Sequence, residues 1–222
     1  VYQITENAFL FKIHPSNLNL IIEPSKRIHL TKFGVKTPRQ PSQLCMALRK
    51  HVRSARIIDY RQPSFERLVF IDLESHGRHL KIVAELLPRG NIILVDDDNK
   101  VVVSTHYLRM KDRSIKRGEL LTLPPPRGRD FLQATPNEIT NLRNLGDLEI
   151  VKALAQIFGV AGTFAEEILE RAQINKSMPA RDLTDDQVVS ISRAVASLKD
   201  ALLSGQRSPA IILDDSQMVD VT

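Results

Sequence analysis

A run of three prolines, Pro124-Pro125-Pro126, divides the sequence into two parts whose apolar residues repeat with different periods. Proline fixes its own φ angle and lacks an N–H group, so neither a helix nor a central strand continues through such a run. Before the prolines, apolar residues alternate with polar ones as in strands, and after them they recur every three to four positions as in amphipathic helices. The sequence therefore predicts an α+β protein, with an antiparallel β-rich domain over residues 1–130 and a helical domain over residues 131–206.

The β-rich part contains strand-like segments separated by short breaks such as His76-Gly77 and Arg89-Gly90. Such breaks are typical of hairpin turns, which predicts an antiparallel meander. Ser42 is expected to cap a helix that carries Leu44, Leu48 and Val52 on one face. The expected strands are residues 8–14, 17–23, 27–32, 65–74, 78–87, 91–96 and 101–106.

The helical part begins with Thr135-Pro136, where proline suits the first helical position. Further helices are expected over residues 149–158, 163–172 and 184–203, and residues 207–222 predict a returning β-hairpin. Residues 159–162, Gly-Val-Ala-Gly, join two of the helices in a helix-hairpin-helix pattern, whose backbone N–H groups can point at a phosphate. Glutamates at 166, 167 and 170 oppose that role, so a structural hairpin or a protein contact is an equal alternative.

Charge is unevenly distributed along the chain. Residues 1–130 carry 23 Lys+Arg and 13 Asp+Glu, whereas residues 131–222 carry 8 and 13. The basic residues are densest in residues 26–61 and again in residues 109–129. Such a distribution favours a polyanionic partner for the first part, although basic residues can also serve only to solvate a surface.

The sequence gives little support for catalysis or for a bound metal or cofactor. A single cysteine, Cys45, excludes a disulfide framework and a four-cysteine zinc site, and its place in an expected amphipathic helix indicates a buried thiol. Residues 96–98, three aspartates, suit a turn better than a cation site. No nucleotide-binding glycine motif occurs, and no serine nucleophile motif does either.

No apolar run approaches the ~20 residues that a membrane helix needs, and no signal peptide is visible at the start. These observations lead us to expect a cytoplasmic protein with no membrane partner.

Residues 65–67, Phe-Glu-Arg, open one of the expected strands. Alternation would place Arg67 on the same face as Val69 and Ile71, with Glu66 on the other face. A guanidinium on an apolar face needs either an internal carboxylate or, at the rim of a sheet, an external phosphate. The residues alone leave both alternatives open.

Several segments resemble, in order, the amino-terminal region of the NFACT family. They are residues 18–31 (LNLIIEPSKRIHLT), 46–51, 89–94, 113–118 with the following prolines, and 162–167. This family includes NEMF and RqcH and was long labelled fibronectin-binding protein A-like. The resemblance implies a β-rich domain similar to the formamidopyrimidine DNA glycosylases, followed by a helix-hairpin-helix.

The resemblance also implies a function in ribosome-associated quality control without enzymatic activity. Family members bind a large ribosomal subunit that holds peptidyl-tRNA, and recruit aminoacyl-tRNA so that a carboxy-terminal tail is added; a ubiquitin ligase or another quality-control factor is a further candidate partner. The family's Asp-Arg pair for tRNA recognition falls on Glu66 and Arg67, with Glu in place of Asp. The basic residues expected to contact RNA phosphates are Lys26, Arg27, Lys32, Arg49, Lys50, Arg53, Arg89, Arg113, Lys116 and Arg117.

The chain departs from the family pattern at its ends and in the hairpin. Family members begin with a helix before the first strand and continue into a coiled coil, so we expect a fragment that leads toward an absent coiled coil. Ala161 stands where glycine is common in the hairpin. Two other functions stay open: a DNA glycosylase, which would need an amino-terminal proline, and a fibronectin-binding adhesin, which would need an export signal.

Overall fold

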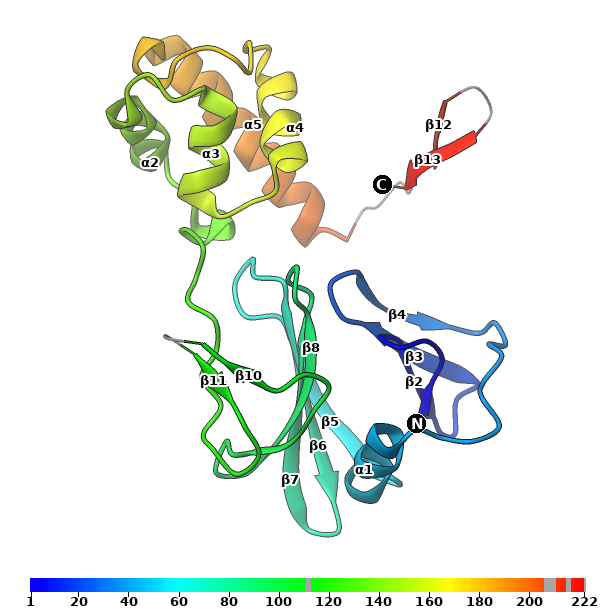
Figure 1. The fold of residues 1–222 in the computed structure, drawn as a ribbon. Helices are drawn as coiled ribbons and strands as arrows, with labels where there is room; N and C mark the ends of the chain where they lie inside the picture. Colours follow the sequence, from blue (N-terminus) through cyan, green and yellow to red (C-terminus); the bar gives the residue numbers. More distant parts are fainter. Residues whose placement is uncertain (111–112, 206–210, 215–216, 222) are drawn as a thin grey trace. The chain divides into compact units, whose positions relative to one another are not determined.

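The computed structural model describes residues 1–110, 113–205, 211–214 and 217–221 (Figure 1). The chain divides into two compact units, Val1–Pro125 and Pro126–Thr222. The border thus falls within the run of prolines, whereas the sequence analysis placed it after residue 130. The first unit consists mainly of antiparallel sheets and the second of helices, so the predicted α+β class is confirmed.

The first unit contains two larger antiparallel sheets. Sheet A has the order β1-β2-β3-β4, and sheet B has the order β5-β6-β7-β8-β9. Helix α1 (Gln43–Val52) connects them, and its predicted cap is confirmed because the Ser42 side chain accepts from the Cys45 N–H. The strands are β1 (Tyr2–Gln3), β2 (Phe9–Ile13), β3 (Leu18–Glu23), β4 (Arg27–Thr31), β5 (Arg56–Arg61), β6 (Leu68–Ser75), β7 (Arg78–Glu85), β8 (Asn91–Asp96), β9 (Val101–Ser104), β10 (Leu108–Arg109) and β11 (Ser114–Ile115).

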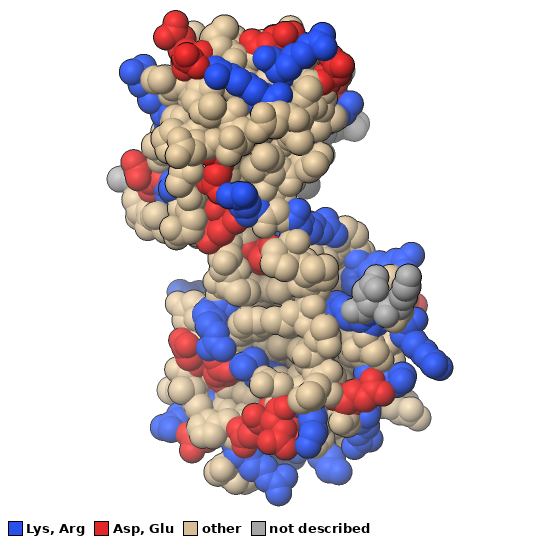
Figure 2. All heavy atoms as spheres, turned by 90° about the vertical axis from the view of Figure 1, so that its left-hand side faces the viewer, with Lys and Arg blue, Asp and Glu red and all other residues tan. Residues whose placement is uncertain are grey.

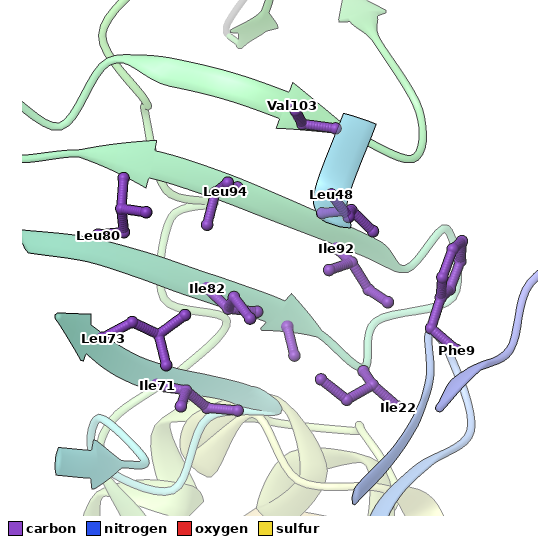
Figure 3. Packing of buried hydrophobic residues seen from close by; sticks show 11 residues of the cluster. Phe9, Ile22, Leu48, Ile71, Leu73, Leu80, Ile82, Ile92, Leu94 and Val103 are labelled. Carbon is purple, nitrogen blue, oxygen red and sulfur yellow. The ribbon is translucent and has the colours of Figure 1, made fainter. Parts of the chain in front are cut away.

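The main core lies between sheet A, α1 and one face of sheet B (Figure 3). Alternation along β6 and β7 turns Ile71, Leu73 and Ile82 toward this core, which also contains Phe9 of β2 and Leu48 of α1. A smaller cluster covers the other face of sheet B, where Val83, Ile93, Val95 and Val101 pack with Ile115 of β11. Burial of this apolar surface, at about 25 cal/mol per Å², provides the driving force that holds the two sheets together.

The second unit is a group of helices around its own core of aliphatic and aromatic side chains. The ring of Phe131 meets those of Phe158 and Phe164 edge-to-face, with centroids 6.0 and 4.9 Å away. The predicted helix start at Thr135 is confirmed by a capping box with Glu138. The helices are α2 (Pro136–Thr140), α3 (Ile150–Phe158), α4 (Gly162–Ala172) and α5 (Asp185–Leu203), with short 3-10 turns at Phe131–Gln133, Asn141–Leu145 and Ala180–Asp182.

The two-residue strands β1, β10 and β11 were not expected, and two longer strand predictions need correction. Strand β5 was missed: a bulge between Ile57 and Asp59 leaves Ile58 as an extra residue and breaks the alternation on which the prediction relied. The strand predicted over residues 65–74 begins only at Leu68, because Ser64 has a positive φ of 52° and the Glu66 N–H closes a turn on the Pro63 carbonyl.

The predicted returning hairpin is present as β12 (Ile211–Asp214) paired antiparallel with β13 (Gln217–Val221). The turn expected at residues 214–217 falls partly on residues 215–216, which lie outside the described part of the chain.

Candidate nucleic-acid interface

Three connecting segments of the first unit meet at one end of its sheets (Figure 1). They are residues 24–26 between β3 and β4, residues 62–67 before β6, and residues 86–90 between β7 and β8; we call them together the loop junction. The Leu86 N–H donates to the Arg67 carbonyl at 2.8 Å, and the Gly90 N–H donates to the Ser25 Oγ at 2.9 Å. These long-range bonds join all three segments, since the Arg67 side chain also donates to the Ser25 carbonyl.

Arg67 is exposed and is oriented by main chain rather than by an acid. Its Nη2 donates to the Ser25 carbonyl oxygen at 3.1 Å, and it makes no ion pair with any residue in the described ranges. The expectation that Arg67 shares the apolar face of β6 is therefore wrong, because the residue precedes the strand. A carbonyl neutralises no charge, so the guanidinium keeps its full attraction for an external anion.

Glu66 lies half-buried beside Arg67 in the turn. Its backbone carbonyl accepts from the Gln62 Nε2 at 2.7 Å, and its N–H donates to the Pro63 carbonyl at 3.2 Å. The turn therefore fixes the backbone of Glu66, while its carboxylate forms no ion pair within the described chain.

Three further cations of the predicted set lie in or beside the loop junction. Lys26 and Arg27 both contact Glu23, at 2.9 and 3.0 Å, yet their side chains are 71% and 62% exposed. The hydrogen bond from Lys26, followed by that from Arg27, holds the pKa of Glu23 below its ordinary value despite partial burial. Arg89 is exposed and contacts no described residue through a hydrogen bond or ion pair. The cations in and beside the loop junction thus outnumber the acids that pair with them.

Three other predicted residues lie on or next to α1, which Figure 1 places at the far end of sheet B from the loop junction. Arg49 donates its Nε to the Val1 carbonyl at 2.7 Å, and its guanidinium lies 4.8 Å from the centre of the Tyr2 ring. Lys50 and Arg53 are exposed. Lys32 is exposed just after β4, at the end of that strand opposite to Arg27. The basic block of residues 26–61 is therefore divided in space.

Arg113 does not belong to an accessible basic patch, so that prediction is wrong. Its guanidinium forms a two-pronged ion pair with Glu85, which is 1% exposed; Nη1 lies 3.2 Å from Oε2, and Nη2 contacts Oε1. Its Nε donates to the Thr122 carbonyl at 2.7 Å. Arg113 joins the segment around β11 to β7, because a buried carboxylate requires such a partner.

The last two predicted cations lie in the segment around β11. Lys116 pairs with exposed Glu119 at 3.0 Å. Arg117 is exposed, and it lies close enough to His51 to contribute to the lowering of that histidine's pKa, after burial and after the charge of Lys50. These two cations remain accessible, although neither belongs to the loop junction.

In the glycine-containing hairpin of the second unit, the backbone at Gly159 packs directly against the backbone at Gly128. Gly159 ends α3 with a φ of 61°, and a Cβ on Gly128 would lie 2.3 Å from the Gly159 nitrogen. Glu166 and Glu167, which weighed against a phosphate site, pair with Lys176 and Arg171 at 2.8 and 2.6 Å. Figure 2 shows basic and acidic side chains intermixed over one face of this unit. A nucleic-acid contact by the hairpin stays a prediction.

The expectations about Cys45 and the aspartates of residues 96–98 are confirmed. Cys45 is fully buried in α1. The Asp96 Oδ1 accepts from the backbone N–H groups of Asp98 and Lys100, which makes the segment a turn. Among the described residues, no group of three or more potential ligands could hold a metal ion. None of the described helices is both long and apolar enough to span a membrane.

The family and the fold of this chain are both found among known proteins. The family model for NFACT N-terminal and middle domains matches residues 1–222, so the chain belongs to the NFACT family, as its motifs indicated. The amino-terminal part of the fibronectin/fibrinogen-binding protein of Streptococcus suis has the same fold, with a TM-score of 0.71 at 19% identity over 97% of this chain and 79% of that one. The finer likeness to formamidopyrimidine DNA glycosylases stays a prediction.

Two relatives extend the comparison. The archaeal Rqc2 homolog aRqcH of Methanocaldococcus jannaschii is 31% identical in an alignment 222 positions long that covers 96% of this chain and 33% of that protein. The ribosome quality control complex subunit 2 of Saccharomyces cerevisiae is 30% identical in an alignment 106 positions long that covers 46% of this chain and 10% of that protein. The chain thus spans a third or less of the length of these curated relatives.

Proposed function

We propose that this chain acts in ribosome quality control as a binding module without catalytic activity. Its partners would be tRNA and the large ribosomal subunit that holds peptidyl-tRNA, and its task would be to recruit aminoacyl-tRNA for carboxy-terminal tailing of a stalled chain. Support comes from the family and from the name of the yeast relative, a ribosome quality control complex subunit. The proposal also assigns the protein to the cytoplasm, where ribosomes translate.

The observation that best supports the proposal is that Arg67 is exposed and has no acidic partner among the described residues. Its guanidinium is exposed, and its hydrogen bond to the Ser25 carbonyl orients it without neutralising its charge. Lys26, Arg27 and Arg89 surround the same junction with further exposed cations. In this proposal the cations hold the tRNA backbone, because phosphate contacts position a nucleic acid without reading its sequence. Arg67 would make the oriented contact, and Glu66 would accept a hydrogen bond from a base or a sugar hydroxyl.

The first test replaces Arg67 by alanine and measures tRNA affinity and melting temperature together. Loss of a charge-assisted contact should weaken tRNA binding by roughly one to two decades. Because Arg67 is exposed and bonded only to a carbonyl, unfolding free energy should change by less than about 1 kcal/mol. Arg193→Ala removes an exposed arginine of α5 and serves as the matched control. A large drop in melting temperature, with binding lost only in proportion to unfolding, would contradict the proposal.

Glu66→Gln isolates the role of the carboxylate, because it removes the charge while keeping the size of the side chain. If Glu66 accepts from tRNA in its ionised form, affinity should fall, and the double change with Arg67→Ala should cost less than the sum of the single changes.

A second experiment identifies the RNA. The protein is isolated from cells and its bound RNA is sequenced. Joint enrichment of tRNA and large-subunit RNA is the expected result. Enrichment of bulk messenger RNA instead would oppose the proposal.

A further inference from the structure

A hollow of about 580 Å³ lies in the first unit, at the end of sheet B opposite to the loop junction (Figure 1). Its walls are the last turn of α1, the β6–β7 hairpin and the turn between β8 and β9, and we call it the hairpin hollow. Arg67 and Ser75 stand at either end of β6, about 26 Å apart at 3.3 Å per residue. The lining residues, none of them near an end of the sequence, are Lys50, His51, Ser75, His76, Arg78, His79, Leu80, Asp96, Asp97, Asp98 and Val102.

Ser75 brings an unused hydroxyl to the floor of the hairpin hollow. The residue is 6% exposed, and its side chain forms no hydrogen bond with any residue in the described ranges. No described side-chain oxygen is both sealed from solvent and unpartnered, so the Ser75 Oγ is reached from the hollow. Arg78 lies directly opposite Ser75 in the β6–β7 hairpin, so the two side chains share one face of sheet B. Because buried hydroxyls are normally satisfied, this one indicates the position of a ligand.

Three cations without an internal partner surround His51 of α1. Lys50, Arg78 and Arg117 are exposed, and none of them forms an ion pair or a side-chain hydrogen bond within the described chain. Burial lowers the pKa of His51 most, and the charges of these cations, that of Lys50 first, lower it further. An anion beside the imidazole would therefore relieve repulsion among like charges. Lys50 and His51 also complement the carboxyl end of α1, but that role leaves the two arginines unexplained.

The acidic wall of the hairpin hollow is mostly engaged in its own turn. The Asp96 Oδ1 accepts from two backbone N–H groups, and Asp98 pairs with Lys100 at 3.1 Å. Asp97 is exposed and forms no ion pair with any described residue. The two other histidines of the lining are exposed at the rim. The hairpin hollow thus offers cations and a hydroxyl on one side and a free carboxylate on the other.

We propose that the hairpin hollow binds a small phosphorylated molecule that carries hydroxyl groups, such as a nucleotide or a sugar phosphate. The phosphate would lie between Lys50, Arg78 and the Ser75 hydroxyl, because charge-assisted hydrogen bonds are the strong ones for such oxyanions. His51 would lie beside it, and the Asp97 carboxylate would accept from a hydroxyl of the same molecule. The volume suits this class, since small-molecule pockets commonly measure about 300–1,000 Å³. The site is separate from the loop junction and does not rest on the proposed function.

The test follows the histidine side-chain signals of the intact chain by NMR during addition of ribose 5-phosphate, adenosine 5′-monophosphate, ribose or inorganic phosphate. Both phosphorylated ribose compounds should move the His51 signals saturably and raise the pKa of His51, because a bound phosphate stabilises the imidazolium. Ribose should leave the signals unchanged, and inorganic phosphate should bind at least roughly threefold more weakly, because it lacks the hydroxyl contact. His14 and His29 do not line the hairpin hollow and are internal controls. Tighter binding of adenosine monophosphate would identify a nucleotide site, and equal binding a sugar-phosphate site.

Variants tie the signal to the proposed contacts. Lys50→Gln with Arg78→Gln should weaken binding of the tighter compound at least about tenfold. Ser75→Ala should weaken it roughly three- to tenfold, and the melting temperature should not fall, because the hydroxyl has no partner among the described residues. Lys36→Gln with Arg193→Gln removes the same charges from exposed positions outside the hairpin hollow and should bind normally.

Three results would overturn the proposal. The first is that neither phosphorylated compound moves the His51 signals at millimolar concentration; if an RNA oligonucleotide then moved them, the hairpin hollow would be an RNA surface instead. The second is that Lys50→Gln with Arg78→Gln binds as tightly as the unaltered chain. The third is that inorganic phosphate binds as tightly as the two ribose compounds, which would mean an adventitious ion only.

Discussion

The loop junction of the β-rich unit and the helical unit use their basic residues in different ways. In the helical unit, six basic side chains pair with acids of the same unit: Arg129, Arg143, Lys152, Arg171, Lys176 and Arg181. In the β-rich unit, Arg56, Arg61, Lys81, Lys100, Arg113 and Lys116 also pair with acids. At the loop junction, however, Arg67 and Arg89 have no acidic partner among the described residues, and Lys26 and Arg27 share a single one. The comparison teaches that net charge alone does not mark a binding surface. What matters is which cations the protein leaves without an internal partner.

The largest expected effect concerns Arg113, the cation of the β-rich unit whose acidic partner, Glu85, is buried. Arg113→Leu leaves Glu85 buried without its partner, which should cost about 3–5 kcal/mol of unfolding free energy. Chemical denaturation measures this cost. Lys116→Ala is the control, since its exposed pair with Glu119 should contribute at most about 1 kcal/mol. If Arg113→Leu kept full stability but lost tRNA affinity, Arg113 would belong to the tRNA-binding residues after all.

The next effect concerns the hairpin of the helical unit. Gly128→Ala forces a Cβ to within 2.3 Å of the Gly159 nitrogen, and such overpacking typically costs about 1–3 kcal/mol or more. Gly162→Ala meets open space at the start of α4 and should change stability by less than about 1 kcal/mol. Both are measured by thermal unfolding. If Gly162→Ala weakened tRNA binding without loss of stability, the hairpin would lie close to the RNA. Binding of tRNA would then not be confined to the β-rich unit.

A smaller effect should appear in the salt dependence of tRNA binding. Each lost phosphate contact should flatten the slope of log affinity against log salt by roughly 0.7–0.9. Lys26→Ala with Arg89→Ala should therefore reduce the slope by about one to two contacts. Lys152→Ala with Lys176→Ala removes two cations of the helical unit that already pair with glutamates, and should leave the slope unchanged. If both double variants changed the slope equally, the paired cations of the helical unit would contact RNA phosphates as much as those of the loop junction do.

The smallest effect concerns Glu23 and pH. Because its pKa is lowered in the folded state, chiefly by the hydrogen bond from Lys26, its ion pairs add stability above the ordinary carboxyl pKa. That stability is lost as the pH falls through the lowered folded value. Lys26→Ala should raise the Glu23 pKa toward its ordinary value and cost less than about 1 kcal/mol at neutral pH. An NMR titration of the Glu23 side chain measures the shift, and Arg27→Ala should produce a smaller one. An unchanged pKa in Lys26→Ala would show that the turn itself, rather than the cation, stabilises the carboxylate.

Much of the fold was predictable because local signals and tertiary packing agree. The cap at Ser42 and the strands beginning near residues 9, 18 and 27 follow from turn chemistry and alternation. Strand β5 was not predictable in this way, because its pairing shifts by one residue at Ile58 and all six of its residues are exposed. Its pairing with β6 is decided by contacts between segments rather than by its own pattern.

The candidate site was only partly predictable for a related reason. Sequence analysis found Arg67 and Arg89, yet it grouped Arg113 with them, because a one-dimensional count of charges cannot show that Glu85 lies against it. It also treated residues 26–61 as one basic block, whereas the fold places Lys26 at the loop junction and Arg53 at the end of α1. Only the three-dimensional pairing of strands separates these surfaces.

The hydrogen bond that orients Arg67 has a consequence for how this surface can evolve. Its acceptor is the main-chain carbonyl of Ser25, which every amino acid possesses, so no exchange of the residue-25 side chain deletes the acceptor itself. Mutational sensitivity moves instead to Gly90, where any Cβ would meet the Ser25 nitrogen at 2.3 Å and the Glu85 carbonyl oxygen at 2.4 Å. An exchange at position 25 would lose the hydrogen bond between the Ser25 Oγ and the Gly90 N–H but keep the acceptor for Arg67. We expect selection to be stricter at position 90, a residue whose missing side chain keeps Ser25 and Arg67 in place.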